Sequence, residues 1–174
     1  MKKVWGVMFC SMVLAACATN PWAPTATAVL EPSSGSHVHG TVKFTQQGGN
    51  IHVTGNVWGL TPGNKGFHIH EKGDCSDPKA MSAGGHFNPG GSKHGAPGSG
   101  HVGDLGNLVA DKDGRATIDV TLKGVLWRKE VSDSIVGRSV VVHMNEDDLK
   151  TDPSGNSGER IACGVIGAPA GLTY

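Results

Sequence analysis

The sequence predicts an all-β protein of about eight short antiparallel strands, arranged as a sandwich or a barrel and interrupted by two long loops. Short segments alternate between apolar and polar residues, turn residues separate them, and no amphipathic helical pattern of useful length appears. Glycine makes up 27 of the 174 residues, about twice its average share, which suits a chain with many turns. This length corresponds to one domain.

Turn residues mark the boundaries between the strands. Gly48-Gly49-Asn50 precedes the third segment, Pro62-Gly63-Asn64 precedes the fourth, and Lys112-Asp113-Gly114 forms a hairpin signal between the fifth and sixth. The expected strands span Ala26–Glu31, Val38–Thr45, Ile51–Trp58, Gly66–His70, Leu105–Ala110, Ala116–Thr121, Ser139–His143 and Arg160–Ile166.

Two segments have no strand pattern. Glu71–Gly100 is rich in glycine, and Met144–Glu159 is polar and acidic. Loops longer than about 12–15 residues inside a compact domain are usually functional, so we expect these two to carry the site.

The N-terminus has the pattern of an export signal. Lys2 and Lys3 precede an apolar run of 11 residues, which is too short to span a membrane. The run ends in Leu14-Ala15-Ala16-Cys17, which resembles a bacterial lipoprotein cleavage site, although ordinary cleavage after small residues is the alternative. We therefore expect a signal peptide over 1–16, a lipidated tether over 17–27 and the functional domain over 28–174. The lipid on Cys17 would anchor the protein to a membrane, on the periplasmic side of a bacterial envelope.

The four cysteines follow from this interpretation. Cys10 leaves with the signal and Cys17 carries the lipid, so Cys75 and Cys163 remain. In an exported chain the remaining pair is expected to form a disulfide, and two buried thiols are the alternative.

Seven potential metal ligands are the main chemical feature of the chain. They are His68, His70, His86, His94, His101, Asp104 and His143. Imidazole suits zinc and copper, and seven ligands complete two four-coordinate sites if one imidazole is shared. His86 lies between the two groups in sequence and is the natural shared ligand.

The ligand types divide into two sites. His86, His94, His101 and Asp104 would form a closed tetrahedral set, the pattern of structural zinc, whereas His68, His70, His86 and His143 would form a four-nitrogen set that suits Cu(II). Strand alternation turns Phe67 and Ile69 to the core and the neighbouring histidines outward. We therefore expect the copper site on the outer wall, beneath the loops. His37, His39 and His52 are interpreted as ordinary surface or core residues.

Several long motifs now resemble the copper–zinc superoxide dismutases. They are Gly66-Phe67-His68-Ile69-His70-Glu71, Ala83-Gly84-Gly85-His86-Phe87-Asn88-Pro89, Lys93-His94-Gly95, His101-Val102-Gly103-Asp104-Leu105-Gly106-Asn107 and Gly158-Glu159-Arg160-Ile161-Ala162-Cys163-Gly164-Val165-Ile166-Gly167. The resemblance covers roughly residues 28–168. It implies a Greek-key barrel of eight strands, the same division of copper and zinc ligands, and a Cys75–Cys163 disulfide.

The resemblance also implies an activity, the dismutation of superoxide to dioxygen and hydrogen peroxide by a copper that alternates between Cu(II) and Cu(I). It assigns catalytic roles to His86, which supplies a proton, and to Arg160, which attracts and orients the anion. Asp147 matches the carboxylate that connects a copper histidine, His68, to a zinc histidine, His94. A homodimer is possible, with Trp58 and Trp127 as interface or packing residues.

Two features depart from the family pattern. Cys75 lies only five residues after His70, and the loop Met144–Glu159 is short. Its only cation is Lys150, against the acids Glu146, Asp147, Asp148, Asp152 and Glu159. We therefore expect anion steering to depend on Arg160 and on lysines elsewhere, such as Lys72 or Lys93.

Other functions fit the sequence less well. A formal net charge of zero, with no basic stripe or aromatic platform, argues against a nucleic-acid partner. A blue-copper carrier needs a cysteine ligand, and both remaining cysteines are expected in a bridge. The main alternative is a non-catalytic copper- or zinc-binding envelope protein on the same scaffold.

Overall fold

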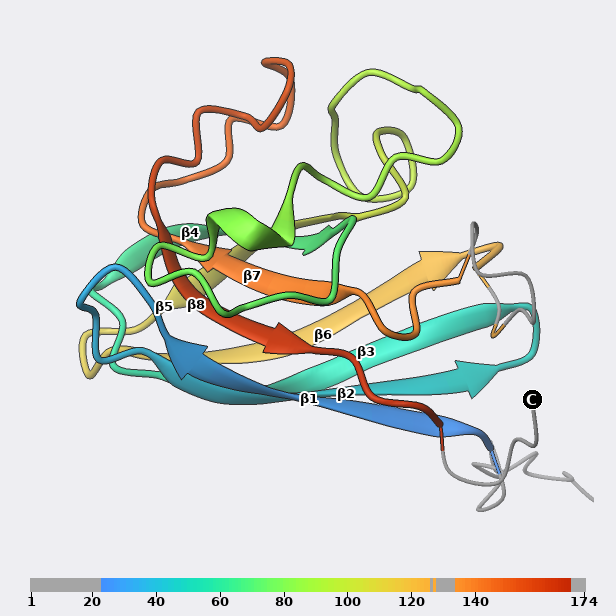
Figure 1. Cartoon of the computed structure of the whole chain (residues 1–174), viewed down its shortest axis with the longest axis horizontal. Helices are drawn as coiled ribbons and strands as arrows, with labels where there is room; N and C mark the ends of the chain where they lie inside the picture. The colour runs from blue at the N-terminus through green and yellow to red at the C-terminus, as the bar shows by residue number, and fades with distance from the viewer. Residues whose placement is uncertain (1–22, 126, 128–133, 170–174) are drawn as a thin grey trace, which may run out of the picture.

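A computed structural model describes residues 23–125, 127 and 134–169. The expected signal peptide and Cys17 lie outside this part. Eight strands and one short 3-10 helix, η1, form the fold (Figure 1). They are β1 (Thr25–Pro32), β2 (His39–Gln47), β3 (Asn50–Trp58), β4 (Gly63–His70), η1 (Met81–Ala83), β5 (Asp104–Ala110), β6 (Arg115–Lys123), β7 (Ser139–His143) and β8 (Arg160–Val165). The predicted all-β class and strand number are confirmed.

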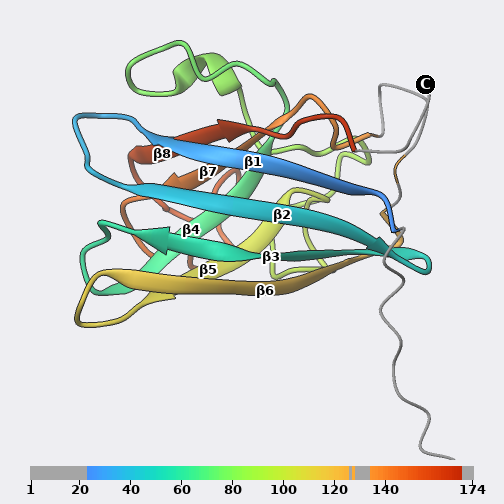
Figure 2. The same ribbon diagram turned by 90° about the horizontal axis from the view of Figure 1, so that it is seen from below.

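The strands form one antiparallel sheet that curls into a nearly closed barrel. Their order is β5-β4-β7-β8-β1-β2-β3-β6, so β1 pairs with β8, and β4 pairs with β7 across a long connection. These non-consecutive neighbours give the Greek-key arrangement. Figure 2 shows the wall of β1, β2, β3 and β6 in front of the wall that contains β4, β5, β7 and β8.

Strand alternation fills the barrel interior. Ala28, Leu30, Phe67, Ile69 and Val142 are buried in one apolar cluster with residues from the other strands. On β4, His68 and His70 point the opposite way, yet both have no exposed surface. Their burial therefore comes from cover outside the barrel wall, as expected.

The two long loops provide that cover. Residues 71–103 and 144–159 lie on the same side of the barrel, over β4, β7 and β8 (Figure 1). The outward-facing Val141 of β7 packs beneath them with Ala80, Ala83 and Cys163. A second, smaller apolar cluster thus fixes the first loop to the outer wall.

The first strand begins one residue earlier than the Ala26–Glu31 strand expected from the sequence. Thr25 is the first residue of β1, which therefore overlaps the segment 17–27 interpreted as the tether. Ala26 is buried and pairs with Phe44 of β2, so its packing extends the strand. In the part of the chain that the structure describes, no helix is long and apolar enough to cross a membrane.

Four other histidines and tryptophans of the described residues, His39, His52, Trp58 and Trp127, make contacts of an ordinary structural kind. His52 contacts Asp119 at 2.8 Å, and His39 stacks on Trp58, whose side chain is exposed. Trp127 packs against the core, and its Nε1 donates to the carbonyl of Pro24. None of these belongs to a cluster of potential metal ligands among the described residues.

Candidate metal centre

The structure gathers the seven predicted ligands into two adjoining groups. One contains His68, His70, His86 and His143, and the other contains His86, His94, His101 and Asp104. Within each group the potential ligand atoms all lie within 4.8 Å of one another. His86 belongs to both groups, and that its ring is shared between two metals stays a prediction.

Backbone pairing aligns the first group. His68 and His70 lie on β4, and His143 ends β7, the strand that pairs with β4. His86 comes from the first loop, which returns to form an isolated antiparallel bridge with His70. The amide of Phe87 donates to the carbonyl of Ile69 at 2.8 Å, so the loop is joined to the strand at this point.

Hydrogen bonds on the far side of each ring determine which nitrogen faces the group. His70 Nδ1 bonds to the Gly84 carbonyl at 3.0 Å and His143 Nδ1 to the Gly158 carbonyl at 3.3 Å. Their Nε2 atoms then lie 3.3 Å apart. His68 Nδ1 and His86 Nε2 are buried and make no hydrogen bond. Four ring nitrogens therefore converge with their acceptor positions free, which is the arrangement that a metal ion needs.

The second group is organised around Asp104. Its Oδ1 lies 3.0 Å from His86 Nδ1 and 3.3 Å from His101 Nδ1, and its Oδ2 lies 3.1 Å from His94 Nδ1. The backbone amides of Gly95 and His101 donate to Oδ2. Burial opposes ionisation, but the hydrogen bonds from His86 and these amides outweigh it and hold the pKa of Asp104 below its usual value. Three nitrogens and one carboxylate match the donor set of zinc.

Asp147 connects the two groups by contacting the Nε2 atoms of two histidines whose Nδ1 atoms have no hydrogen-bond partner. Its Oδ2 accepts from His68 Nε2 at 2.7 Å, and its Oδ1 accepts from His94 Nε2 at 2.8 Å. Asn107 bonds to the backbone of Asp147 in both directions. Gly155 lies so close to the carboxylate that a Cβ at this position would collide with Oδ1. One side chain therefore contacts a ring in each group.

Burial disfavours the charged form of three histidines of the first group. It lowers the pKa of His68 and His70 well below the usual value and that of His143 to about 4. These rings are therefore neutral at pH 7, which is the form that binds a metal.

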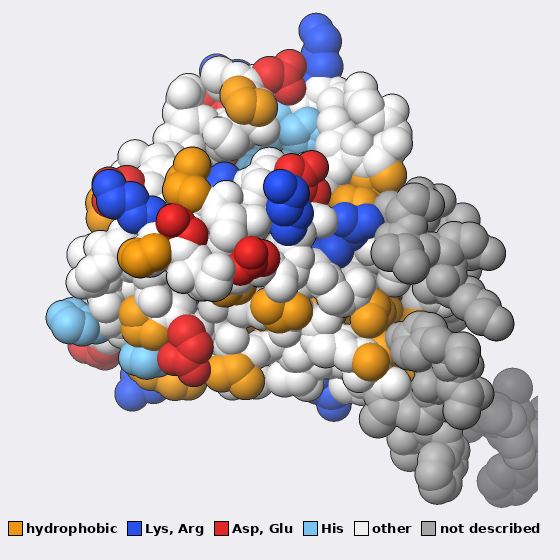
Figure 3. All heavy atoms as spheres, viewed as in Figure 1, with side chains coloured by type: hydrophobic (Ala, Val, Ile, Leu, Met, Phe, Trp, Pro, Cys, Tyr) orange, Lys and Arg blue, Asp and Glu red, His pale blue; other side chains and the backbone are white. Residues whose placement is uncertain are grey.

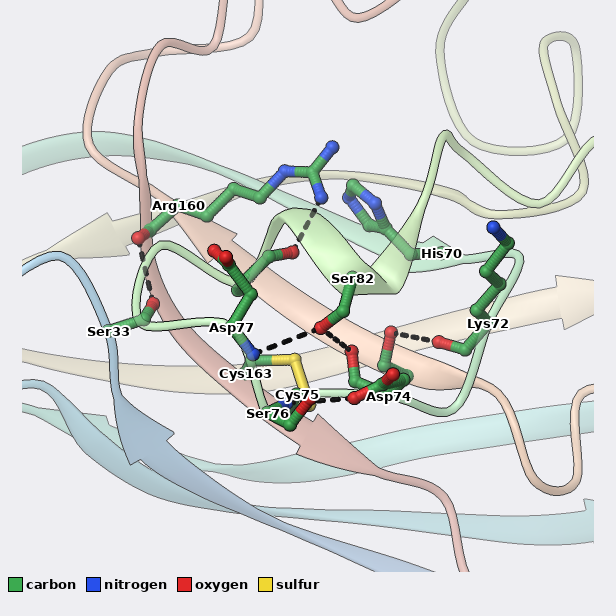
Figure 4. The surroundings of a disulfide bond; sticks show 12 residues. Ser33, His70, Lys72, Asp74, Cys75, Ser76, Asp77, Ser82, Arg160 and Cys163 are labelled. Atoms are coloured by element: carbon green, nitrogen blue, oxygen red, sulfur yellow. Dashed lines mark hydrogen bonds between the residues drawn. A yellow bond between two sulfur atoms is a disulfide. The ribbon is translucent and has the colours of Figure 1, made fainter.

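A pocket of about 360 Å³ opens onto the first group. His70, His86 and His143 line it, together with Lys79, Glu159 and Arg160. Figure 3 shows histidine side chains at a hollow between the two loops. The Arg160 guanidinium donates to the carbonyls of Ala80 at 2.7 Å and Gly84 at 2.6 Å, and it lies beside His70 (Figure 4).

The predicted disulfide joins Cys75 to Cys163, with the two Cα atoms 5.8 Å apart (Figure 4). The alternative of two buried thiols is therefore wrong. The bridge ties the beginning of the first loop to β8, three residues after Arg160.

One cation of the pocket was not predicted from the sequence. Lys79 lines the pocket, whereas Lys72 and Lys93, which were suggested for anion steering, are not among the lining residues. The path of the loop between Cys75 and His86 decides which lysine faces inward. No periodic pattern in this segment signals that path.

Comparisons with known proteins agree with this geometry. The sequence profile of the family described as "Copper/zinc superoxide dismutase (SODC)" matches residues 38–166. The chain is 45% identical over 157 residues to "Extracellular superoxide dismutase [Cu-Zn]" of Brugia pahangi, covering 84% of this chain and 77% of the relative. The solved structure titled "Crystal Structure Analysis of the clock protein EA4" superposes with a TM-score of 0.74 at 41% identity, covering 87% of this chain and 98% of that one. The family profile, the similar protein and the similar solved structure all agree with the two histidine groups described above. The chain belongs to the copper/zinc superoxide dismutase family.

Proposed function

We propose that His68, His70, His86 and His143 hold copper, and that His86, His94, His101 and Asp104 hold zinc. As a member of its family, the protein is an oxidoreductase that uses both metals and dismutates superoxide to dioxygen and hydrogen peroxide. The bound copper supplies the one-electron redox chemistry. The observation that carries the ligand assignment is the set of buried ring nitrogens without hydrogen-bond partners, which includes His68 Nδ1, His86 Nε2, His94 Nδ1 and His101 Nδ1.

His86 has a second role in this proposal. Its Nδ1 is directed at Asp104, while its Nε2 faces the other three histidines of the copper group. The ring can therefore carry a proton at Nε2 without losing its orientation towards the zinc group. Because His86 also lines the pocket, that proton is placed for delivery to the reduced substrate.

Arg160 attracts and orients the anion in this proposal. Its guanidinium lines the pocket near His70 and is held by two backbone carbonyls, so its charge is fixed at the approach to the histidines. Superoxide is small and anionic, and a fixed cation raises the local concentration of such a substrate. Superoxide dismutases are themselves an established example of this electrostatic steering.

Two substitutions test the division of ligands. Asp104→Ala should lose zinc while copper still binds through its four histidines. His143→Ala should weaken copper binding and abolish activity while zinc stays. Metal content by mass spectrometry, measured beside the superoxide-dismutating rate, reports both results. Unchanged zinc content and affinity in Asp104→Ala would contradict the assignment.

We also propose that the protein is exported and anchored by a lipid on Cys17. The support is the N-terminal pattern, with a signal over 1–16, a tether from residue 17 and the functional domain after it, and the extracellular relative is consistent with export. On this proposal the domain stands on the periplasmic side of a bacterial membrane. Wild-type protein should fractionate with membranes, and Cys17→Ser should escape lipid-dependent processing. Wild-type protein found wholly in the soluble fraction would exclude the anchor.

Association into a homodimer is a separate prediction from the sequence. Trp58 is exposed on the barrel surface, and sedimentation of the purified protein would measure whether two copies associate.

A further inference from the structure

The active-site pocket contains two residues that do not favour an anionic substrate. Lys79 and Arg160 attract superoxide, but Glu159 lines the same pocket with a carboxylate and Met81 lines it with a neutral thioether. Glu159 is exposed, and among the described residues its side chain forms no ion pair. Met81 is 61% exposed. For anion steering alone, the Glu159 carboxylate is unfavourable because it repels an anion, and the neutral Met81 thioether contributes nothing.

Both residues suit a cation that enters the same pocket. A thioether is a soft ligand that favours Cu(I) over harder ions. A carboxylate on the lining of the same pocket offsets part of the positive potential that would otherwise repel a cation. The pocket also leads to His86, whose side chain is only 3% exposed and whose Nε2 has no hydrogen-bond partner. The soft donor and the acid therefore share a pocket with an imidazole nitrogen that is free to bind a metal.

We propose that Met81 and Glu159 form a transient entry site for Cu(I) on its way to the histidine group. The inference rests on the proposed copper ligands. The metal stays Cu(I) throughout this step, and only its ligands change, from the incoming carrier to the thioether and then to the imidazoles. No electron or proton donor is needed.

The backbone around Met81 is well suited to this role. Its amide donates to Asp77 Oδ1 at 3.1 Å, and its carbonyl accepts from the Gly84 amide at 3.1 Å. The preceding carbonyl, that of Ala80, accepts from Arg160. The main chain is thus fixed, while the unbranched side chain can rotate between the pocket mouth and its interior.

Copper uptake by zinc-loaded, copper-free protein tests the proposal. Cu(I) is supplied without oxygen as its bicinchoninate complex, and the loss of the colour of the complex gives the uptake rate. Met81→Leu, which keeps the volume and removes the sulfur, should slow Cu(I) uptake severalfold. It should leave Cu(II) uptake unchanged and reach the same final copper content. Met144→Leu is the matched control, because Met144 is also exposed but is not among the residues that line the pocket.

The Glu159→Gln variant tests the contribution of the carboxylate charge separately from that of the Met81 thioether. It should slow the uptake of both Cu(I) and Cu(II), and it should raise the superoxide rate per bound copper, because the same carboxylate repels the substrate. Wild-type Cu(I) uptake in Met81→Leu, or equal slowing of Cu(I) and Cu(II) in that variant, would overturn the entry site while the ligand assignment stands. A wild-type protein that binds no copper would overturn the ligand assignment and the entry site with it.

Discussion

His70 and Arg160 donate hydrogen bonds to the same atom, the carbonyl oxygen of Gly84. The distances are 3.0 Å from His70 Nδ1 and 2.6 Å from Arg160 Nη2. A histidine of the copper group and the cation of the pocket are therefore positioned by one peptide unit. That unit follows η1, in the segment that the Cys75–Cys163 disulfide ties to β8.

Substitution of Arg160 should lower activity without releasing metal. Arg160→Ala removes the fixed charge, and we expect the rate at low substrate concentration to fall by about tenfold or more. Arg160→Glu should be worse, because it reverses the local field. Arg160→Lys should be intermediate, because it keeps the charge but lacks the planar fork that engages two carbonyls. Pulse radiolysis at several ionic strengths measures each rate, and the salt dependence should weaken in Arg160→Ala.

Arg115→Ala provides the control for this series. Arg115 is an exposed arginine at the start of β6, outside the pocket, and its removal changes the net charge by the same amount. It should leave the rate near that of the wild type. An Arg160→Ala enzyme with full metal content, wild-type rate and the same salt slope would show that Arg160 does not steer the substrate.

Loss of the disulfide should reduce stability and loosen the pocket. The bridge joins residues 88 positions apart, and the chain-entropy model assigns roughly 4–5 kcal/mol to a loop of this length. The Cys75→Ser, Cys163→Ser double variant should lose a comparable free energy of unfolding in urea, with activity falling because Ala80 and Gly84 no longer hold Arg160. In the native oxidised wild type neither cysteine should react with an alkylating agent, and reaction of both would mean that the bridge is absent in solution.

Much of this architecture follows from local sequence patterns. Alternation on β4 is enough to place Phe67 and Ile69 inside and the two histidines outside, because successive side chains of a strand point to opposite faces. The same rule places His143 outside β7. The number and type of ligands also suggested two four-ligand groups if one histidine is shared, and the metal that each group holds stays a prediction.

The parts that could not be predicted depend on the path of irregular backbone. The first loop contains Lys72, Lys79 and Lys93, and no sequence pattern indicates which of them lies near the site. Of the three, only Lys79 lines the pocket in the folded loop. The acceptors of Arg160 are backbone carbonyls, which any residue carries, so no side-chain pattern marks Ala80 or Gly84. The extension of β1 to Thr25 likewise depends on pairing with Thr45, a contact between distant segments.

Asp147→Asn should weaken both metal groups at once. The Oδ2 atom accepts from His68, and Oδ1 accepts from His94 and from the Leu149 amide, whereas an amide nitrogen in place of either oxygen cannot accept a hydrogen bond. Loss of an outer partner of this kind typically weakens metal affinity by about 10–100-fold, so we expect that range for zinc. The copper electron paramagnetic resonance spectrum should also change, because the His68 ring loses its orientation.

Asp148→Asn is the matched control for Asp147. Asp148 accepts hydrogen bonds only within its own loop, from Lys150, Thr151 and Asn156 in the described part of the chain. It should keep wild-type zinc affinity and the wild-type copper spectrum. Equal zinc affinity in Asp147→Asn and Asp148→Asn would contradict the proposal that the Asp147 carboxylate orients the rings of the two metal groups.

The metal-free protein should lose stability between about pH 6.5 and pH 4. An unfolded histidine titrates near 6.5, whereas burial lowers the pKa of His143 to about 4 and lowers those of His68 and His70 as well. Below pH 6.5 the unfolded chain therefore binds protons that the folded protein excludes. The stability is fully present above the unfolded pKa and is lost as the pH falls through the folded value. His143 alone would account for about 3 kcal/mol.

Urea unfolding of the metal-free protein at pH 7.5, 5.5 and 4 would measure this loss as a falling midpoint. His143→Gln should flatten the dependence, since it removes one of the groups that titrates. In the metal-loaded protein the metal ions occupy the same ring nitrogens and compete with protons, so the loss should begin at lower pH. A midpoint that stays constant from pH 7.5 to 4 in the metal-free wild type would mean that these rings bind protons equally in the folded and the unfolded protein, so that burial does not lower their pKa.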